Sequence, residues 1–251
     1  MFFCDRCRVG MGKCNSKMGV GNEKQRTILL IGGSGGIGSA LIQSPLFNSN
    51  IMCVPTFFAN KPIGSDLSWQ YYDSGDLLSA ESMVENLSNE CDIDMIIDAS
   101  GAFFASTIEK TSLDTIRSVV WTNFLAPLAL TKIALKYLAP SGKIVFLSSV
   151  TTQLNVYGSS IYAASKSGLE KTISLLGPEY EKSGKAICGI RLGYMDYGMT
   201  YQISETTRNQ IKNSLPNGEF LTIDALADLL LKLLHSDFSS VTGKIYDLDI
   251  N

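Results

Sequence analysis

The sequence predicts an α/β fold, a doubly wound and mainly parallel sheet of seven strands with helices on both faces. Short runs of apolar and β-branched residues alternate along the chain with longer segments of helical periodicity. A glycine-rich turn directly follows the first of these runs. Hydrophobic residues make up 45% and charged residues 18% of the 251 residues, which is typical of a globular domain.

Seven short runs have the length and composition of strands, and four longer segments have a helical spacing of apolar residues. The predicted strands are Thr27–Ile31, Ile51–Phe57, Trp69–Tyr72, Ile93–Asp98, Lys143–Ser149, Ala186–Leu192 and Lys244–Leu248. The predicted helices span residues 79–90, 112–138, 161–182 and 223–235. A further helix is expected after the glycine turn, and Pro45 should end it early because proline lacks the N–H donor.

The chain is predicted to hold one domain, residues 26–251, because it contains no repeat and no convincing linker. Residues 194–220 are irregular and follow a strand end, so they are a candidate substrate lid. Their tyrosines and methionines suit an apolar substrate, or they serve only for packing. Residues 1–25 are expected to be a flexible extension, or else to reflect a mis-assigned start.

Cysteine usage and charge exclude several classes of function. Cys4, Cys7 and Cys14 include a CxxC, but three ligands fall short of a structural zinc site, and we expect no metal. The first residues lack the apolar core of a secretory signal, which favours the cytoplasm. A net charge of −3 argues against nucleic-acid binding. The sequence contains no run of about 18 apolar residues, so no membrane span is expected.

The glycine-rich turn allows two interpretations. A strand, glycines and a helix start form the usual cradle for a dinucleotide pyrophosphate, because the helix N-terminus presents free N–H groups. The same residues also fit the GxSxG turn of serine hydrolases, with Ser34 as the nucleophile and His235 as the base. His235 follows a helical segment, however, where a histidine favours the helix dipole, so a structural role is expected. The turn consists of Gly32, Gly33, Ser34, Gly35, Gly36, Ile37 and Gly38.

A second group of residues predicts proton transfer. Tyr162 and Lys166 are four residues apart, and thus share a helix face. An ammonium beside a phenol favours the phenolate, so we expect the pKa of Tyr162 to be lowered toward neutrality. Ser149 ends a strand 13 residues earlier, where its hydroxyl can hold a carbonyl opposite the tyrosine, and Asn123 lies in the preceding long helix.

These motifs together resemble the short-chain dehydrogenase/reductase superfamily in its compact, one-domain form, which has a Rossmann-type fold. The glycines match the family's GxxxGxG through Gly32, Gly36 and Gly38. Asn123, Ser149, Tyr162 and Lys166 match its catalytic tetrad in identity, order and spacing. Residues 98–101, Asp-Ala-Ser-Gly, stand where the family usually has Asn-Asn-Ala-Gly, and Leu192 replaces a proline.

The resemblance implies a hydride transfer between a nicotinamide and a carbonyl or secondary alcohol. It makes Tyr162 the general acid or base, Ser149 the group that polarises the substrate oxygen, and Lys166 the partner of the nicotinamide ribose. It makes Asn123 the support of a water relay behind Lys166. The expected cofactor-binding residues are Gly32, Ser34, Gly35, Gly36, Ile37, Gly38, Lys61, Asp73, Ala99, Ser100, Gly101, Asn123, Tyr162, Lys166, Gly193 and Met195.

The choice of nicotinamide depends on the end of the second strand. An acid there would select NAD by binding the ribose 2′-hydroxyl, but residues 56–61, Thr-Phe-Phe-Ala-Asn-Lys, contain none. We therefore expect NADP, with NAD as the alternative, and Lys61 either binds the 2′-phosphate or is a solvated loop lysine. Asp73 is expected at the adenine, with Asp76 as the alternative. Family analogy adds a homodimer or homotetramer formed through the long helices, and a non-catalytic cofactor-binding protein is the second hypothesis.

Overall fold

The computed structural model describes residues 25–47, 50–59, 61–62, 66–198, 200, 203–215 and 217–248. These residues form one seven-stranded sheet with the strand order β3-β2-β1-β4-β5-β6-β7, in which every pair is parallel. The predicted doubly wound α/β fold is therefore confirmed. The strands are β1 (Arg26–Ile31), β2 (Ile51–Phe57), β3 (Gln70–Tyr71), β4 (Ile93–Asp98), β5 (Leu138–Ser149), β6 (Ala186–Leu192) and β7 (Ile245–Leu248). Predictions for Cys4, Cys7, Cys14 and the extension up to residue 24 lie outside the described residues.

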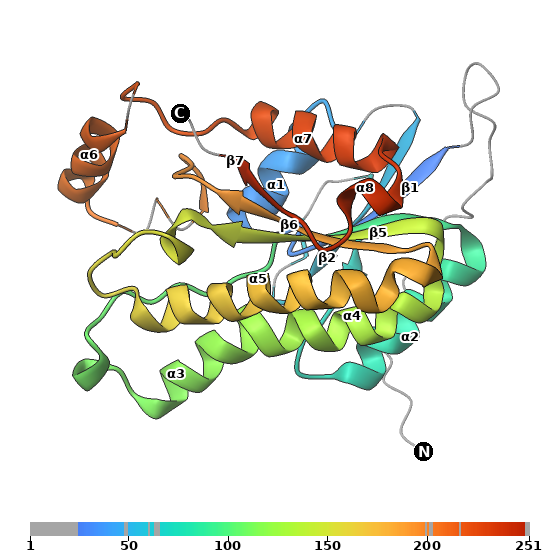
Figure 1. Ribbon diagram of the computed structural model, residues 1–251, viewed down its shortest axis with the longest axis horizontal. Coiled ribbons are helices and arrows are strands. Elements are labelled where there is room, and N and C mark those ends of the chain that lie inside the picture. The colour runs from blue at the N-terminus through green and yellow to red at the C-terminus, as the bar shows by residue number, and fades with distance from the viewer. Residues whose placement is uncertain are drawn as a thin grey trace.

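Helices cover both faces of the sheet (Figure 1). One face packs against α1 (Gly36–Gln43), α7 (Ile223–His235) and α8 (Phe238–Val241), and its core includes Leu41 and Leu230. The other face packs against α2 (Leu77–Glu90), α4 (Ala126–Tyr137) and α5 (Ser160–Tyr180), and its core includes Leu169. Because all strands are parallel, their carboxyl ends meet at one edge, which is where ligands bind in such sheets.

The segment predicted as one helix over residues 112–138 is divided in the structure. The helix α3 (Leu113–Val120) leads into a π-helical turn, Trp121–Leu125, which continues into α4. Single π-helical turns within α-helices are frequent at functional sites, and this one contains Asn123, which is fully buried. Residue 138 belongs to β5, which begins five residues before the predicted Lys143.

One further boundary agrees with the predictions, and one segment differs from them. The helix α1 ends at Gln43, two residues before Pro45, as expected. The candidate lid is partly regular, because α6 (Glu205–Ser214) begins at an N-cap in which Ser204 accepts a hydrogen bond from the Thr207 amide. A serine at this position satisfies an otherwise free N–H of the first turn, which is the signal the prediction overlooked.

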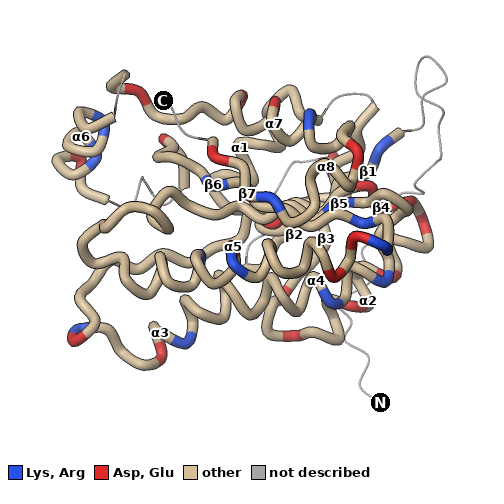
Figure 2. The backbone as a smooth tube through the Cα atoms, viewed as in Figure 1, with Lys and Arg blue, Asp and Glu red and all other residues tan. Residues whose placement is uncertain are grey.

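Residues Leu113–Tyr137 form a stretch that could cross a membrane by length and composition alone, with a hydropathy of 1.3. In the fold, this stretch lies between α2 and α5, and 44% of its most apolar window is buried inside the protein. Packing inside the fold explains part of its apolar character, and one helix of this kind is weak evidence for a membrane span. Figure 2 shows acidic and basic residues interspersed along the described chain, in agreement with the small net charge of −3.

Candidate active site

The glycine turn connects β1 to α1 at the carboxyl edge of the sheet. Gly32 has a φ of +75°, a conformation that favours glycine, and its amide donates to Thr56 Oγ1 over 3.1 Å. A Cβ on Gly38 would lie 2.2 Å from the Gly32 carbonyl oxygen, and a Cβ on Gly36 would lie 2.2 Å from Gly198 Cα. The spacing of these glycines is thus required by close approaches of backbone. The N-cap residue of α1, Gly35, carries no capping side chain, so the helix N-terminus keeps N–H groups for an anion.

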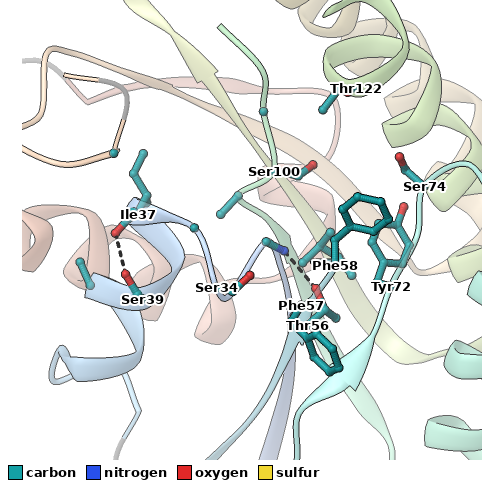
Figure 3. Close-up of a pocket in the computed structure, with 18 of the residues that line it drawn as sticks. Ser34, Ile37, Ser39, Thr56, Phe57, Phe58, Tyr72, Ser74, Ser100 and Thr122 are labelled. Carbon is teal, nitrogen blue, oxygen red and sulfur yellow. Dashed lines mark hydrogen bonds between the residues drawn. The ribbon is translucent and has the colours of Figure 1, made fainter. Parts of the chain in front are cut away.

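A cavity of about 860 Å³ opens beside this turn (Figure 3). Ile37 and Ser39 of α1 lie on one side, Phe58 and Tyr72 lie on the other, and Ser100 lies between them. Its size, its apolar walls and the uncapped helix N-terminus fit a dinucleotide with its pyrophosphate at the glycine turn. Of the predicted cofactor-binding residues, Ser34, Gly35, Gly36, Ala99, Ser100 and Gly101 line the cavity.

The structure separates the two candidate aspartates after β3. Asp73 lines the cavity, whereas the Asp76 carboxylate accepts a hydrogen bond of 3.0 Å from the Ser79 amide and caps α2. Lys61 is exposed and is not among the described residues that line the cavity. In this conformation of the chain, the walls near the end of β2 are aromatic, with Phe58 stacked on Tyr71.

The predicted catalytic residues meet at the carboxyl ends of β5 and β6. Tyr162 lies in the first turn of α5 and is 7% exposed, and its side chain lies near that of Ser149 at the end of β5, close enough for the Ser149 hydroxyl to influence the phenol. Phe103 packs edge-on against the Tyr162 ring, with the ring centroids 5.1 Å apart. Tyr162 and Ser149 therefore lie close enough for one substrate oxygen to contact both hydroxyls.

The expected lowering of the Tyr162 pKa is not found in the protein without its cofactor. Burial raises the pKa of Tyr162 above its usual value, and the nearby Ser149 hydroxyl lowers it by a smaller amount. The phenol is therefore held in its protonated form at neutral pH, as a general acid requires. The prediction gave weight to Lys166 and neglected the loss of solvent around the ring.

Lys166 follows Tyr162 by one turn of α5 and is 3% exposed. Its ammonium donates a hydrogen bond of 2.8 Å to the Leu147 carbonyl oxygen, in β5. Burial lowers the pKa of Lys166, whereas the carboxylates of Asp98 and Glu170 raise it. An ammonium has three N–H donors, so Leu147 leaves capacity for a ligand.

Asn123 uses both atoms of its amide group to hold the loop after β4. Its Oδ1 accepts from the Ala102 amide at 2.9 Å, and its Nδ2 donates to the Ala102 carbonyl oxygen at 2.7 Å. The same loop is held further along by a hydrogen bond of 2.9 Å from the Ser106 amide to the Gly158 carbonyl oxygen. These bonds fix Phe103 against Tyr162, and the water relay proposed for Asn123 stays a prediction.

Glu170 of α5 and Arg191 of β6 form a buried ionic network near the predicted catalytic residues. Arg191 of β6 donates through Nη2 to Glu170 Oε2 at 2.7 Å and through Nε to Oε1 at 3.2 Å. Glu170 Oε1 also accepts from Ser148 Oγ at 2.6 Å and from Thr152 Oγ1 at 3.0 Å. The network joins α5, which carries Tyr162, to the strand end that carries Ser149, so it fixes the distance between them.

Ser34 and His235, the two residues of the alternative hydrolase site, lie near opposite ends of the strands. Ser34 follows the carboxyl end of β1 and lines the cavity. His235 ends α7, where its Nδ1 contacts the Leu231 carbonyl oxygen at 2.9 Å. The preceding residue, Leu234, accepts a hydrogen bond from Lys143 in the amino-terminal half of β5. This separation leaves Ser34 without the predicted base.

The structure adds residues to the predicted site and removes others from the cavity. Gly193 donates to the Leu248 carbonyl oxygen at 2.8 Å, and Met195 is buried in a bridge with Leu221, so neither lines the described cavity. The next residues, Tyr197 and Gly198, do line it. The sequence offered no signal for Gln43, Thr56, Phe58, Tyr72, Thr122 or Gly198, because they reach the cavity only through tertiary structure.

A family model described as enoyl-(acyl carrier protein) reductase matches residues 61–250. The chain belongs to the short-chain dehydrogenase/reductase superfamily. The predicted family is thus confirmed, and with it the expectation of an oxidoreductase rather than a non-catalytic protein.

Curated relatives of the short-chain dehydrogenase/reductase superfamily align over most of the chain. The uncharacterized oxidoreductase YmfI of Bacillus subtilis is 23% identical over 235 residues, covering 89% of this chain and 97% of the relative. Carbonyl reductase family member 4 of Xenopus laevis is 28% identical, covering 65% of this chain and 67% of the relative. The 3-oxoacyl-[acyl-carrier-protein] reductase FabG of Salmonella typhimurium is 24% identical, covering 67% of this chain and 70% of the relative.

Solved structures of superfamily members share the fold. BdcA in complex with NADPH superposes with a TM-score of 0.80 at 21% identity, covering 89% of this chain and 93% of that one. A short-chain dehydrogenase from Burkholderia cenocepacia in complex with NADP also gives a TM-score of 0.80, at 20% identity, covering 90% of this chain and 96% of that one. At these identities, the likeness establishes the architecture.

Proposed function

We propose that this protein is an NADP(H)-dependent carbonyl reductase, or alcohol dehydrogenase in the reverse direction, with NAD(H) as the weaker cofactor. The contact of Tyr162 with Ser149, at the same sheet edge as the uncapped glycine turn, carries the proposal. A pair of hydroxyls that can hold one oxygen suits a carbonyl better than a carbon–carbon double bond. The NADPH and NADP bound to two structural neighbours, and the lack of an acid after β2, support the choice of cofactor.

In the proposed reduction, Ser149 and Tyr162 hold the substrate oxygen between their hydroxyl groups. The bound nicotinamide supplies the hydride that the protein's own side chains lack. As negative charge develops on the oxygen, Tyr162 Oη donates its proton and the alcohol forms. Lys166 lies one helical turn behind, where its ammonium stabilises the resulting phenolate and binds ribose hydroxyls. Asp73, Ser34 and Thr56 would hold the adenosine and phosphate end in the cavity.

Turnover and binding together test this function. Purified protein is titrated with NADPH and with NADH, and is then supplied with ketones, 3-oxoacyl thioesters and enoyl thioesters while the nicotinamide absorbance is followed. We expect NADPH to bind more tightly than NADH, and a ketone or 3-oxoacyl thioester to be reduced. Reduction of the enoyl thioester alone would contradict the carbonyl assignment, and failure to bind either nucleotide would contradict the whole proposal.

We propose further that two copies associate through the long helices α4 and α5, as a homodimer or within a homotetramer in the cytoplasm. Leu125, at the end of the π-helical turn that leads into α4, is 41% exposed, and Leu175 of α5 is 53% exposed, so this region presents apolar side chains to the surroundings. Light scattering on the purified protein measures the mass directly. A monomer at micromolar concentration would contradict this part of the proposal.

A further inference from the structure

Two carboxylates face Lys166 from different elements, and their surroundings differ. Glu170 lies on α5, one turn after Lys166, and its two oxygens are bound by Arg191 and by two hydroxyl groups. Its negative charge is therefore partly balanced by the arginine, which also pairs with Asp247. Asp98 is the last residue of β4, and its exposed fraction is 4%.

The bonds of Asp98 come from neutral donors. Ser100 donates to Asp98 Oδ1 through its amide at 2.9 Å and through its hydroxyl at 2.5 Å. Neutral donors orient a carboxylate but do not balance its charge. A buried carboxylate in this setting needs a cation nearby, or else it takes up a proton.

The sheet register brings Asp98 to the same side as Lys166. Asp98 pairs with Phe146 across β4 and β5, and its side chain shares the face of Ile96 and Phe146, against which α5 packs. The Lys166 ammonium is bound to Leu147, the next residue of β5. Asp98 and Lys166 thus converge on two consecutive residues of one strand, and the two charges interact.

We propose that Asp98 is a positioning residue whose carboxylate acts as the counter-ion of Lys166 and keeps it in the ammonium form. The inference deepens the proposed function and rests on it for the role of Lys166 toward Tyr162. Asp98 stands where an asparagine is usual in the family that the sequence resembles, so this charge is a feature of the present chain. An asparagine would keep the hydrogen bonds from Ser100 but not the charge.

The electrostatics of the neighbouring groups support this role. Burial lowers the pKa of Lys166, and Asp98 and Glu170 oppose that effect. Burial raises the pKa of Asp98, whereas the bonds from Ser100 and the charge of Lys166 lower it. Tyr72, beyond the end of β3, also faces Asp98, and burial followed by the charge of Asp98 raises the pKa of its phenol. Arg191 pairs with Glu170 and also with Asp247.

The pH profile of carbonyl reduction tests the role of Asp98 in the enzyme. In Asp98→Asn, the pKa of Lys166 should fall, so the alkaline limb of kcat/KM should move to lower pH by about one unit. Asp94→Asn is the matched control, because Asp94 is a buried carboxylate of the same strand that pairs with Arg26 at 2.8 Å, near the other end of β4. The proposal would be overturned if the alkaline limb of kcat/KM lay at the same pH in Asp98→Asn and the wild type. An equal shift of that limb in Asp98→Asn and Asp94→Asn would also overturn it.

A second measurement does not depend on turnover. In protein labelled with ¹³C-lysine and free of nucleotide, the Lys166 signal is assigned by its loss in Lys166→Arg, and its pKa is followed by NMR. We expect a lower Lys166 pKa in Asp98→Asn than in the wild type, whether or not the protein reduces carbonyls. An unchanged Lys166 pKa would contradict the counter-ion role.

If Asp98→Asn does not fold, NMR titration of the Asp98 carboxyl group in protein with labelled aspartate still tests the proposal. The Asp98 carboxyl signal should titrate at higher pH in Lys166→Met than in the wild type, because the compensating ammonium is gone. An unchanged Asp98 pKa would overturn the proposal. Absence of NADPH binding in the wild type would contradict the proposed function while leaving both NMR outcomes interpretable.

Discussion

The two halves of the site are built in different ways. One half lies at the strands β1 and β2, and the other lies at β5 and β6, on the other side of the sheet. Around β1, the site consists of backbone: the glycine turn, a free helix N-terminus and apolar walls, with Asp73 as an acidic group of the described cavity. Around β5, the site consists of side chains, with Tyr162, Lys166 and Glu170 all buried. Residues that are remote in sequence supply the partners of these side chains.

This difference predicts how each half responds to substitution. A backbone cradle depends on the absence of a Cβ at a few positions and tolerates changes elsewhere. A buried polar cluster depends on complete hydrogen bonding and on balanced charge, so removing one member leaves another unsatisfied. Four substitutions test whether the two halves of the site respond differently. They are given in order of decreasing effect.

Removal of the Tyr162 hydroxyl should have the largest effect. In Tyr162→Phe, turnover of a ketone with NADPH should fall by about 10²–10⁴-fold, the usual contribution of a general acid. The dissociation constant of NADPH, measured by fluorescence titration, should change little, because the phenyl ring still packs against Phe103. Retention of full turnover would remove Tyr162 from the mechanism.

Disruption of the buried pair should come next. Glu170→Gln should lower the free energy of unfolding by about 3 kcal/mol, because Arg191 then loses its buried carboxylate partner and keeps only the more exposed Asp247. The matched surface change is Asp114→Asn, whose pair with Arg117 is exposed, and it should cost less than about 0.5 kcal/mol. Urea denaturation measures both values, and equal costs would show that burial of the pair has no energetic consequence.

A methyl group in the backbone cradle should have a smaller effect on stability but a clear one on binding. In Gly36→Ala, the new Cβ would meet Gly198 Cα at 2.2 Å, so the segment after β6 must shift. We expect a loss of about 1–3 kcal/mol in unfolding free energy, together with weaker NADPH binding.

Gly35→Ala is the control for this change, because the nearest described atom to a Cβ there is 3.1 Å away. Calorimetry on both variants distinguishes a close approach at one glycine from a general preference for glycine in the turn. Equal affinities of Gly36→Ala and Gly35→Ala for NADPH would contradict the role of the contact with Gly198.

The smallest effect is expected at Lys61. In Lys61→Ala, the NADPH dissociation constant should rise by no more than about threefold, as for an exposed, solvent-screened charge. The NADH dissociation constant should stay the same. A loss of tenfold or more with NADPH alone would place the ammonium on the 2′-phosphate and restore the role that the sequence predicted for it.

The sequence predicted the architecture well because local patterns determine it. Alternating runs identified all seven strands, and Pro45 marked the end of α1. The sequence could not predict the π-helical turn at Trp121–Leu125 or the start of β5, because both depend on packing against neighbouring elements. The helix α6, within the candidate lid, was missed, although Ser204 provides its N-cap.

The same limit applies to the site. Motif spacing placed Ser149, Tyr162 and the glycine turn, because each motif is contiguous or nearly so. It gave the wrong direction for the pKa of Tyr162, since burial around a phenol is a property of the folded state. It also missed the link between Glu170 and Arg191, which are 21 residues apart on a helix and a strand.

Transfer of a labelled hydride tests whether the protein reduces a carbonyl with a hydride from NADPH and a proton from Tyr162. The protein is incubated with NADPH carrying deuterium at the transferable C4 position and with a ketone that it turns over, and the alcohol is analysed by mass spectrometry. We expect one deuterium on the carbinol carbon in the wild-type product, and a rate of deuterium transfer that collapses in Tyr162→Phe. Alcohol without deuterium, or an equal rate in the two proteins, would contradict this mechanism.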